Sequence, residues 1–549
     1  MKSSTPSIFN DVIGPVMRGP SSSHCAAAVR IGRMARDLMD GEIKDVLVEF
    51  DPDGSLATTH ASQGSDMGLY GGLLGWEPTD ARLLSSAQTL QAVGINVTIN
   101  ITPIQAEHPN TYQMTMTNSR EKHSLTAIST GGGIIEVIRI DGVRVSLAGD
   151  YYETLIQVGS GGNDLLEYLQ ENIPADEILL PGNEHTRFVE IKSQGFLSQE
   201  ALLALRSQFD IRSIKQIAPV LPVLSHGEIN VPFITCAEML EYNRDKQLDL
   251  WELAVHYERA RGALSTEQVL EKMTDIIDIM QNAIQEGLAG THYADRILGY
   301  QSGNFQTRME QHGLIDAGVL NQIILYTTAL MESKSAMGLI VAAPTAGSCG
   351  GLPGACIGAA SALGLSRNDM TRAMLAGGMI GIFIAAQATF AAEVGGCQAE
   401  CGAGSGMAAA ALVTLAGGST GQAVNAASMA LQNILGMVCD PVANRVEVPC
   451  LGKNVLAASN ALACANMALA GYDPVIPLDE VIESMDAVGK MLPSALRCTA
   501  YGGLSITKTS KEIEKRLAQK DRESLEGEKY DIQEIKISRQ WRMAGIQIR

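Results

Sequence analysis

The chain has 549 residues, of which 46% are hydrophobic, so it is long enough for more than two domains and supplies ample apolar surface for a large core. Its formal net charge of −19 disfavours a nucleic-acid partner or an anionic membrane surface, because phosphate groups would be repelled. The first residues, MKSSTPSIFNDVIGP, contain one lysine and no apolar run of signal-peptide length, so we expect a cytoplasmic protein with reduced cysteines.

Residues 1–150 are expected to form an α+β domain. Short runs rich in β-branched residues (VLVEF, INVTINITPI, TYQMTMT and GGGIIEVIRI) alternate with one strongly helical segment at 22–39.

The start of that helical segment predicts an anion site. Pro20 breaks the preceding chain, and Ser21, Ser22 and Ser23 then lie at a helix N-terminus, where free N–H groups and the helix dipole favour an anion such as a substrate carboxylate. The alternative is a plain N-cap, which would need only one of the three serines.

Residues 151–225 follow the order strand, helix, strand, strand, helix, strand, with segments such as TLIQV, NDLLEYLQEN and TRFVEIK. This βαββαβ order is typical of a ferredoxin-like unit. Its role is either regulatory or limited to subunit contact. Residues 226–285 are polar and helical in pattern, and we expect them to form a helical linker.

Residues 286–518 are rich in Gly, Ala and Met and predict an all-α domain with turns at PTAGSCGG, GGC and CDP. The uncharged stretch 373–392 is long enough to cross a bilayer. Its small residues, with Gln387 and Thr389 among them, favour a helix packed among other helices, so we expect no membrane partner. Residues 519–549 are dense in charge and predict a surface tail.

Three cysteines, Cys397, Cys439 and Cys450, each lie within two residues of a glycine or proline, in GGCQAECG, MVCDPV and VEVPCLGKN. Thiolates that bind an iron-sulfur cluster lie at turns, where the backbone can bring several sulfurs together. The pattern therefore indicates a metal site. The alternative is burial in the core, because free Cys is among the most buried residue types.

Six segments resemble the iron-sulfur-dependent L-serine dehydratases and occur in that family's order, β-domain before α-domain. They are GPSSSHCAAAVRIGRMA (19–35), EHPNT (107–111), AMGLIVAAPTAGSCGGLPGA (336–355), EVGGCQAECGAGSGMAAAAL (393–412), GMVCDPVANRVEVPC (436–450) and LPSALRCTAYGGL (492–504). Many relatives keep the two domains as separate chains, so the resemblance implies a fusion here. It also implies an ACT-like regulatory role for the ferredoxin-like unit and association as a homodimer.

The resemblance implies deamination of L-serine to pyruvate and ammonia, through dehydration to aminoacrylate. Carried over residue by residue, the ligands of the family's [4Fe-4S] cluster are Cys397, Cys439 and Cys450. Three protein ligands leave one iron open as a Lewis acid for the substrate. Cys401 stands where relatives usually have an aliphatic residue, and it is either a further ligand, a spare thiol near the cluster or a small core residue.

The resemblance does not supply the base that removes the Cα proton. Relatives often carry a histidine in a GHGTD-like stretch where this chain has Gln63, and glutamine cannot act as a base. His60, three positions earlier, and His24, which the resemblance places in the substrate pocket, are our catalytic candidates, with His123 as another group in the right ionisation range. The alternative for each is a structural role.

The resemblance adds Asn110, Thr345 and Gly347 as substrate contacts. The last two lie in the Gly-rich turn PTAGSCGG, which would otherwise only connect two helices. Cys498, in LRCTAYGG, is expected to be a pocket-wall or core residue. Some relatives cap the open iron with a terminal cysteine, but no cysteine follows Cys498, so we do not expect that mechanism here.

Two other functions remain open. Gln63 and Cys401 would suit an enzyme of the same fold and cluster that acts on another β-hydroxy or β-substituted amino acid. The ferredoxin-like unit and the missing histidine would suit a non-catalytic amino-acid sensor. A pyridoxal-phosphate lyase is disfavoured, because Lys334 precedes the Gly-rich turn instead of following a phosphate-binding loop.

Overall fold

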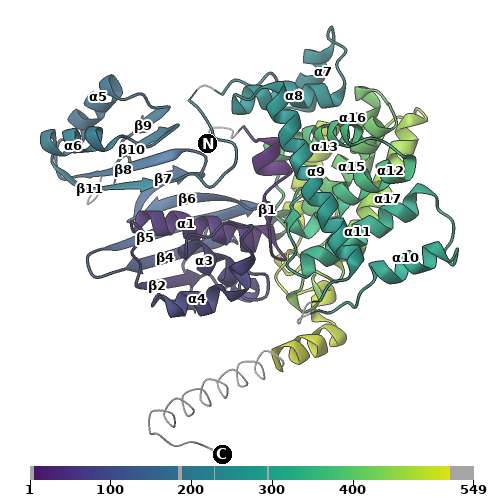
Figure 1. The fold of residues 1–549 in the computed structure, drawn as a ribbon, viewed down its shortest axis with the longest axis horizontal. Helices are drawn as coiled ribbons and strands as arrows, with labels where there is room; N and C mark the ends of the chain where they lie inside the picture. The colour runs from purple at the N-terminus through teal and green to yellow at the C-terminus, as the bar shows by residue number, and fades with distance from the viewer. Residues whose placement is uncertain (1–4, 183–187, 228, 293–295, 520–549) are drawn as a thin grey trace, which may run out of the picture.

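The computed structural model describes residues 5–182, 188–227, 229–292 and 296–519. Figure 1 shows a mixed-sheet N-terminal region beside a helical C-terminal region, so the chain is multidomain, as the sequence predicted. Residues 508–519 are helical, and the rest of the predicted charged tail lies outside the described residues.

The larger sheet has six strands in the order β3-β2-β4-β5-β6-β7. The pair β2 and β3 is parallel, and every other neighbouring pair is antiparallel. The strands are β2 (Asp45–Phe50), β3 (Asn96–Ile101), β4 (Thr111–Thr117), β5 (Lys122–Gly131), β6 (Ile134–Ile140) and β7 (Val143–Leu147). The predicted β-branched runs correspond to β2, β3, β4 and β6, whereas β5 and β7 were not among them.

Helices α1 (Ala27–Leu38) and α3 (Ser65–Leu73) pack on this sheet and share its hydrophobic core (Figure 1). The two helices approach closely at Gly32. A Cβ at this position would lie only 2.6 Å from the Leu69 carbonyl oxygen, so the close approach requires glycine. The predicted helix at 22–39 is confirmed, except that its first turn, η2 (Ser22–Ala26), is a π-helix. The shorter helices are α2 (Leu56–Thr59) and α4 (Ser86–Ala92).

The smaller sheet has four antiparallel strands in the order β11-β8-β10-β9. The elements follow the predicted βαββαβ order, namely β8 (Tyr152–Val158), α5 (Gly162–Asn172), β9 (Glu177–Leu179), β10 (Phe188–Ser193), α6 (Gln199–Gln208) and β11 (Ile211–Ile217). One set of strand side chains packs with the two helices in a core of its own. The other set, Leu155, Phe188 and Ile217, joins the core of the larger sheet, so the two units share a packed face.

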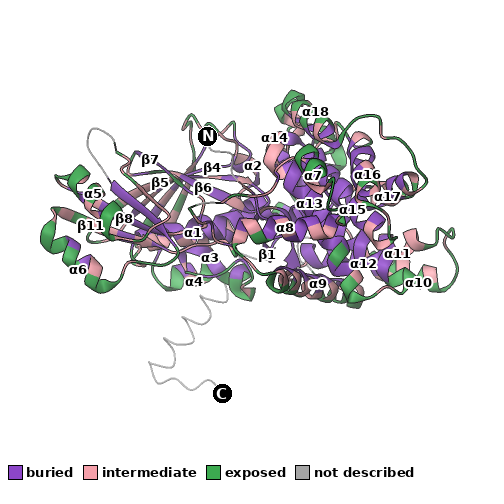
Figure 2. Cartoon of the chain, turned by 90° about the horizontal axis from the view of Figure 1, so that it is seen from above, coloured by how far each residue is buried: buried purple, intermediate pink, exposed green. Residues whose placement is uncertain are grey.

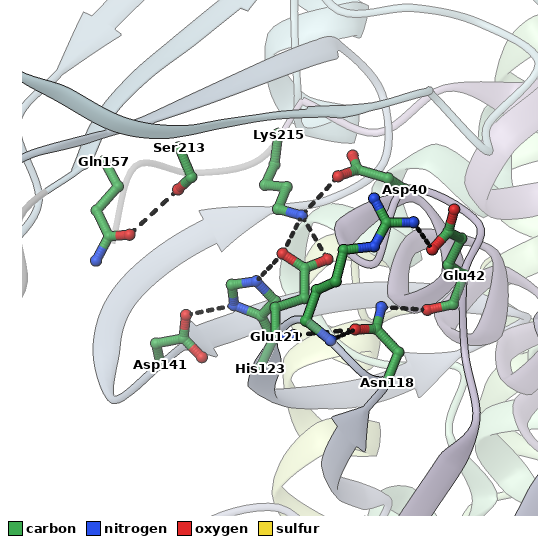
Figure 3. A network of polar contacts seen from close by, with 10 residues as sticks. Asp40, Glu42, Asn118, Glu121, His123, Asp141, Gln157, Ser213 and Lys215 are labelled. Carbon is green, nitrogen blue, oxygen red and sulfur yellow. Dashed lines mark hydrogen bonds and ion pairs between the residues drawn. The ribbon is translucent and has the colours of Figure 1, made fainter.

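A network of polar contacts also joins the two units (Figure 3). Lys215, on β11, is 95% buried and lies 2.7 Å from Asp40 Oδ2 and 2.8 Å from Glu121 Oε2. Glu121 in turn lies 3.4 Å from His123, whose Nδ1 lies 2.7 Å from Asp141 Oδ2. Burial, the largest single effect, would lower the pKa of His123, but the hydrogen bond to Asp141 and the negative charges of Asp141 and Glu121 together outweigh it, so the pKa is raised.

We expect His123 to stabilise the fold in a pH-dependent way. A histidine whose folded pKa is raised contributes stability below its unfolded pKa of about 6.5 and loses that contribution as the pH rises through the folded pKa. Wild type should therefore exceed His123→Gln in melting temperature at about pH 6, by on the order of 1 °C, and the difference should shrink at about pH 8.5. Calorimetry at both pH values tests this, and a difference that grows with pH would contradict it.

The C-terminal region consists of closely packed helices. They are α7 (Cys236–Asn243), α8 (Leu250–Gly262), α9 (Thr266–Ala289), α10 (Ser302–Glu310), α11 (Val319–Ser335), α12 (Gly351–Leu363), α13 (Arg367–Gln387), α14 (Ala392–Gly395), α15 (Ala403–Leu415), α16 (Thr420–Gln432), α17 (Cys450–Leu469) and α18 (Leu478–Met491). Figure 2 shows buried residues concentrated on α13 and α15, with exposed ones on α10 and α18. Within the described residues α13 alone is long and apolar enough to cross a membrane, but 78% of its most apolar window is buried, which favours the predicted core helix.

The N-terminal segment packs into the helical region and not only into the larger sheet. The π-helix η1 (Ile8–Val12) contacts α13, and its apolar side chains belong to the core of the helical region. Glu258 of α8 accepts hydrogen bonds from the Ser7 hydroxyl and from the Ile8 N–H, the latter at 2.9 Å. Next, β1 (Val16–Met17) pairs antiparallel with β12 (Ile340–Val341), so the two regions share a small sheet.

Candidate functional site

Two of the three predicted iron ligands, Cys397 and Cys439, share one buried cluster in the helical region. Cys397 precedes the π-helix η5 (Gln398–Gly402), Cys439 follows α16, and Cys450 is the first residue of α17. Cys397 and Cys439 share a buried cluster with Cys401 and Cys498. Cys450 packs in the main core of the helical region and interacts electrostatically with Cys397 and Cys401.

Positive charge accompanies these sulfurs. The pKa of the Cys397 thiol is lowered to about 7, mainly by a hydrogen bond with Cys401, which together with the charge of Lys453 outweighs burial. Lys453 Nζ donates to the Val438 carbonyl oxygen at 2.6 Å and lies 2.8 Å from Asp440 Oδ1. Burial instead raises the pKa of the Cys450 thiol to about 12. The environment therefore favours the thiolate most at Cys397.

The chemistry of the donor set fits an iron-sulfur cluster, although among the described residues no three His, Cys, Asp or Glu side chains form a compact group that could hold a metal ion. Several buried thiols, with a lysine beside them to offset thiolate charge, are what such a cluster requires.

The predicted serine loop does not act as a plain helix cap. Ser21 is the N-cap residue of η2 but makes no capping hydrogen bond, and its hydroxyl instead lies 3.0 Å from His24 Nδ1. Ser22 Oγ accepts a hydrogen bond from the Ala346 N–H at 3.1 Å. This bond joins the serine loop to the Gly-rich turn, although 324 residues separate the two partners.

His24 is completely buried at this junction. Its Nε2 lies 2.8 Å from Thr59 Oγ1, and its Nδ1 lies 3.5 Å from Glu393 Oε1. Burial, with a smaller contribution from His60, lowers the pKa of His24 to about 3. The ring is therefore neutral at physiological pH and suits hydrogen bonding better than general-base catalysis.

The second histidine candidate is held differently. His60 Nδ1 lies 2.7 Å from Asp66 Oδ1, and its ring packs against Phe50 with centroids 5.4 Å apart. A carboxylate on one ring nitrogen fixes the orientation of an imidazole. Gln63, which replaces the family histidine, is buried, and its Nε2 donates to Cys498 Sγ at 3.4 Å. Gln63 thus reaches the cysteine cluster directly. His123 lies in the network of Figure 3, between the two sheets.

The Gly-rich turn carries the other predicted contacts. Thr345 Oγ1 donates to Glu400 Oε1 at 2.7 Å, and the Gly347 carbonyl oxygen accepts from Asn454 Nδ2 at 2.8 Å. A Cβ on Gly347 would lie 3.0 Å from both carboxylate oxygens of Glu400, so a side chain there would crowd this carboxyl group. Burial raises the pKa of Glu400 to about 8. The turn therefore faces a carboxyl group that holds its proton at neutral pH.

Asn110 is also buried near this site, where its side-chain amide interacts with the Glu393 carboxyl group and lowers the pKa of that group. Burial outweighs this effect, so the pKa of Glu393 is raised. Glu393 Oε1 also lies 3.5 Å from His24 Nδ1, so Asn110 belongs to the polar groups around that histidine.

Several polar residues of the site were not predicted from the sequence. They are Thr59, Glu393, Glu400, Lys453 and Asn454. A signal for some was present, since Glu393 and Glu400 flank Cys397 in EVGGCQAEC. Lys453 and Asn454 follow Cys450 by three and four residues, which is one helical turn and therefore the same helix face.

Known proteins are similar to this chain over most of its length. Residues 245–505 match the family "Serine dehydratase alpha chain". The chain is 37% identical over 285 residues to "Probable L-serine dehydratase, alpha chain" of Bacillus subtilis, which covers 52% of this chain and 95% of the relative. It is 40% identical over 150 residues to "Probable L-serine dehydratase, beta chain" of Bacillus subtilis, a match that covers 27% of this chain and 67% of the relative. It is 26% identical over 502 residues to "L-serine dehydratase 2" of Escherichia coli, covering 89% and 96%.

Proposed function

The chain belongs to the serine dehydratase family, and we propose from that premise that it is an L-serine ammonia-lyase, which deaminates L-serine to pyruvate and ammonia. The observation that best supports this is the convergence of three segments. The serine loop is bonded to the Gly-rich turn, the turn to Glu400, and Glu400 interacts with Cys397.

The residues that would hold a [4Fe-4S] cluster are Cys397, Cys439 and Cys450. When bound, such a cluster supplies a Lewis acid for the departing hydroxyl. The rest of the reaction removes the Cα proton and the hydroxyl as water, which leaves 2-aminoacrylate. This enamine tautomerises to an imine, and water then hydrolyses the imine to pyruvate and ammonia.

The protein's own groups bind and orient the substrate in this proposal. The N–H groups at the start of η2 and the buried Asn110 amide receive the substrate carboxylate. Neutral His24 holds the Ser21 and Thr59 hydroxyls in place. Of the two predicted catalytic histidines, His60 is the better proton acceptor, because Asp66 orients its ring.

The direct test is purification of the full chain without oxygen. We expect a brown protein with an iron-sulfur absorption band that forms pyruvate and ammonia from L-serine, and we expect a chelator to remove both colour and activity. A colourless, iron-free preparation that retains full turnover would overturn the cluster. Colour without turnover of any amino acid would instead favour the sensor role.

A second substrate class is favoured by one observation. Gln63 stands at the family histidine position and contacts Cys498, so the wall of the site differs from the family pattern. We propose as the alternative function that the enzyme acts on another β-hydroxy or β-substituted amino acid. A comparison of kcat/KM for L-serine, L-threonine and a β-chloro analogue decides between the two.

Three further features remain proposals. The βαββαβ unit acts as an ACT-like regulatory domain, the enzyme is a cytoplasmic homodimer, and the domains follow the predicted boundaries 1–150, 151–225, 226–285, 286–518 and 519–549. The position of the unit supports the first. Lys215 of β11 contacts Asp40, just after α1, and the N–H of Ala218, just after β11, donates to Asp37 in the last turn of α1, whose start adjoins η2 and the serine loop.

A further inference from the structure

Cys498 lies beside Cys439 because their backbones are paired. The Cys439 N–H donates to the Leu496 carbonyl oxygen at 2.8 Å, and the Cys498 N–H donates to the Cys439 carbonyl oxygen at 2.9 Å. These bonds form a short parallel bridge between Cys439 and Arg497. Cys498 has φ of +59°, a left-handed conformation that is unfavourable for a residue with a side chain. The surrounding structure therefore holds this residue in a position that it would not adopt alone.

Hydrogen bonds from the N-terminal region hold the Cys498 segment from the other side. Ser55 Oγ donates to the Cys498 carbonyl oxygen at 3.1 Å, and Thr58 Oγ1 donates to the Thr499 carbonyl oxygen at 3.3 Å. Both donors lie in or directly before α2, and Gln63 follows α2 by four residues. Cys498 thus lies at the interface between the N-terminal and helical regions.

The side chain of Cys498 also lies between those of Cys439 and Gln63. Cys498 is 5% exposed and packs in one cluster with Cys397, Cys401 and Cys439. Its sulfur lies within hydrogen-bonding reach of the Cys439 sulfur in this cluster. Toward Gln63 the sulfur accepts from Nε2 at 3.4 Å and also faces Oε1 at the longer distance of 3.9 Å. Gln63 is 2% exposed, so water does not compete for either bond.

We infer that Gln63 and Cys498 form a two-step hydrogen-bond relay onto Cys439, which makes Cys498 a positioning residue for an iron ligand. The inference rests on the proposed function. A Cys439 thiolate bound to iron can only accept, so the Cys498 S–H donates to it while Gln63 Nε2–H donates to Cys498. Donors aligned in one direction polarise one another, and the bond withdraws charge from the ligand sulfur.

The relay predicts a change in the electronic properties of the cluster. Hydrogen bonds to the ligand sulfurs stabilise the more negative, reduced cluster and so raise its reduction potential. The same withdrawal of charge makes the irons stronger Lewis acids toward a substrate hydroxyl. This gives Gln63 a role compatible with its inability to act as a base.

The test is a reductive titration of the intact holoenzyme under anaerobic conditions, followed by the paramagnetic resonance signal of the reduced cluster. Cys498→Ala should shift the midpoint potential to more negative values. Gln63→Leu should shift it in the same direction by less. Gln63→Glu should also shift it negatively, because a carboxylate accepts the Cys498 proton and draws it away from Cys439.

The double variant Gln63→Leu/Cys498→Ala decides whether the residues act in series. A relay predicts a potential equal to that of Cys498→Ala alone, whereas independent residues would give additive shifts and overturn the inference. Cys464→Ala, a buried cysteine outside the cluster, is the matched control and should leave the potential unchanged. Cys498→Ser, which keeps a donor, should restore part of the shift.

Failure of this inference is distinguishable from failure of the proposed function. A colourless wild-type protein would refute the proposed cluster, and the relay with it. A coloured, active wild type whose potential is unmoved by Cys498→Ala would refute the relay alone. Loss of iron from Cys498→Ala, with Cys464→Ala intact, would show that Cys498 is itself a ligand and would also reject the positioning role.

Discussion

Cys439→Ser is expected to abolish iron binding and pyruvate formation together. A hydroxyl is a far weaker iron ligand than a thiolate, and Cys439 is buried, so solvent does not readily replace the lost ligand. We expect iron content and kcat/KM with L-serine to fall by more than about 100-fold. Iron analysis, the visible absorption band and a pyruvate assay on the anaerobically purified variant measure this.

Cys464→Ser provides the matched control. Cys464 is equally buried but lies in the core of the helical region, where its sulfur accepts from Asn433 Nδ2 at 3.3 Å and donates to Asn460 Oδ1 at 3.6 Å. A serine hydroxyl can make both bonds, so iron and activity should remain at wild-type levels. Equal loss in both variants would indicate general misfolding, and an active Cys439→Ser would refute its role as a ligand.

His24→Ala should lower kcat/KM for L-serine by about 100-fold while the cluster stays bound. The substitution removes the partner of the Ser21 and Thr59 hydroxyls, so the serine loop loses the contact that orients it. Because the pKa of His24 is lowered to about 3, its loss should not remove a limb of the pH profile between about pH 6 and pH 9.

His256→Ala separates this effect from the general loss of a histidine. His256, on α8, lies 3.2 Å from the Tyr242 hydroxyl and outside the site, so its removal should leave kcat/KM unchanged. If His24→Ala instead abolished a pH-dependent limb near neutrality, His24 would be the base and the orienting role would be wrong. Visible absorption of each variant reports whether the cluster is retained.

The patterns that depend on neighbouring residues were predictable from sequence. The βαββαβ order and the helix at 22–39 follow from local periodicity, and both are observed. Strand β5 was not predicted, because many of its positions are Ser, Thr or Ala, so the hydrophobicity of its two faces differs little. The π-helical first turn at Ser22 also has no simple sequence signal.

Contacts between distant segments were less predictable. Turn-forming neighbours marked Cys397, Cys439 and Cys450 as a group; the first two share a buried cluster, and Cys450 interacts with Cys397 electrostatically. No local pattern pairs Gln63 with Cys498, because 435 residues separate them and the contact exists only where two domains meet. The neutral state of His24 likewise depends on burial, which its local sequence does not reveal.

The N-terminal segment has a consequence for how the fused halves hold together. Ser7 to Met17 contacts the helical region through Glu258, α13 and β12, so the chain connection between the two regions is not their sole tie. A protease that cut that connection should therefore leave the two regions associated. Because both regions lie on one chain, they are present in equal amounts and need no bimolecular encounter to associate. The N-terminal segment then holds them together.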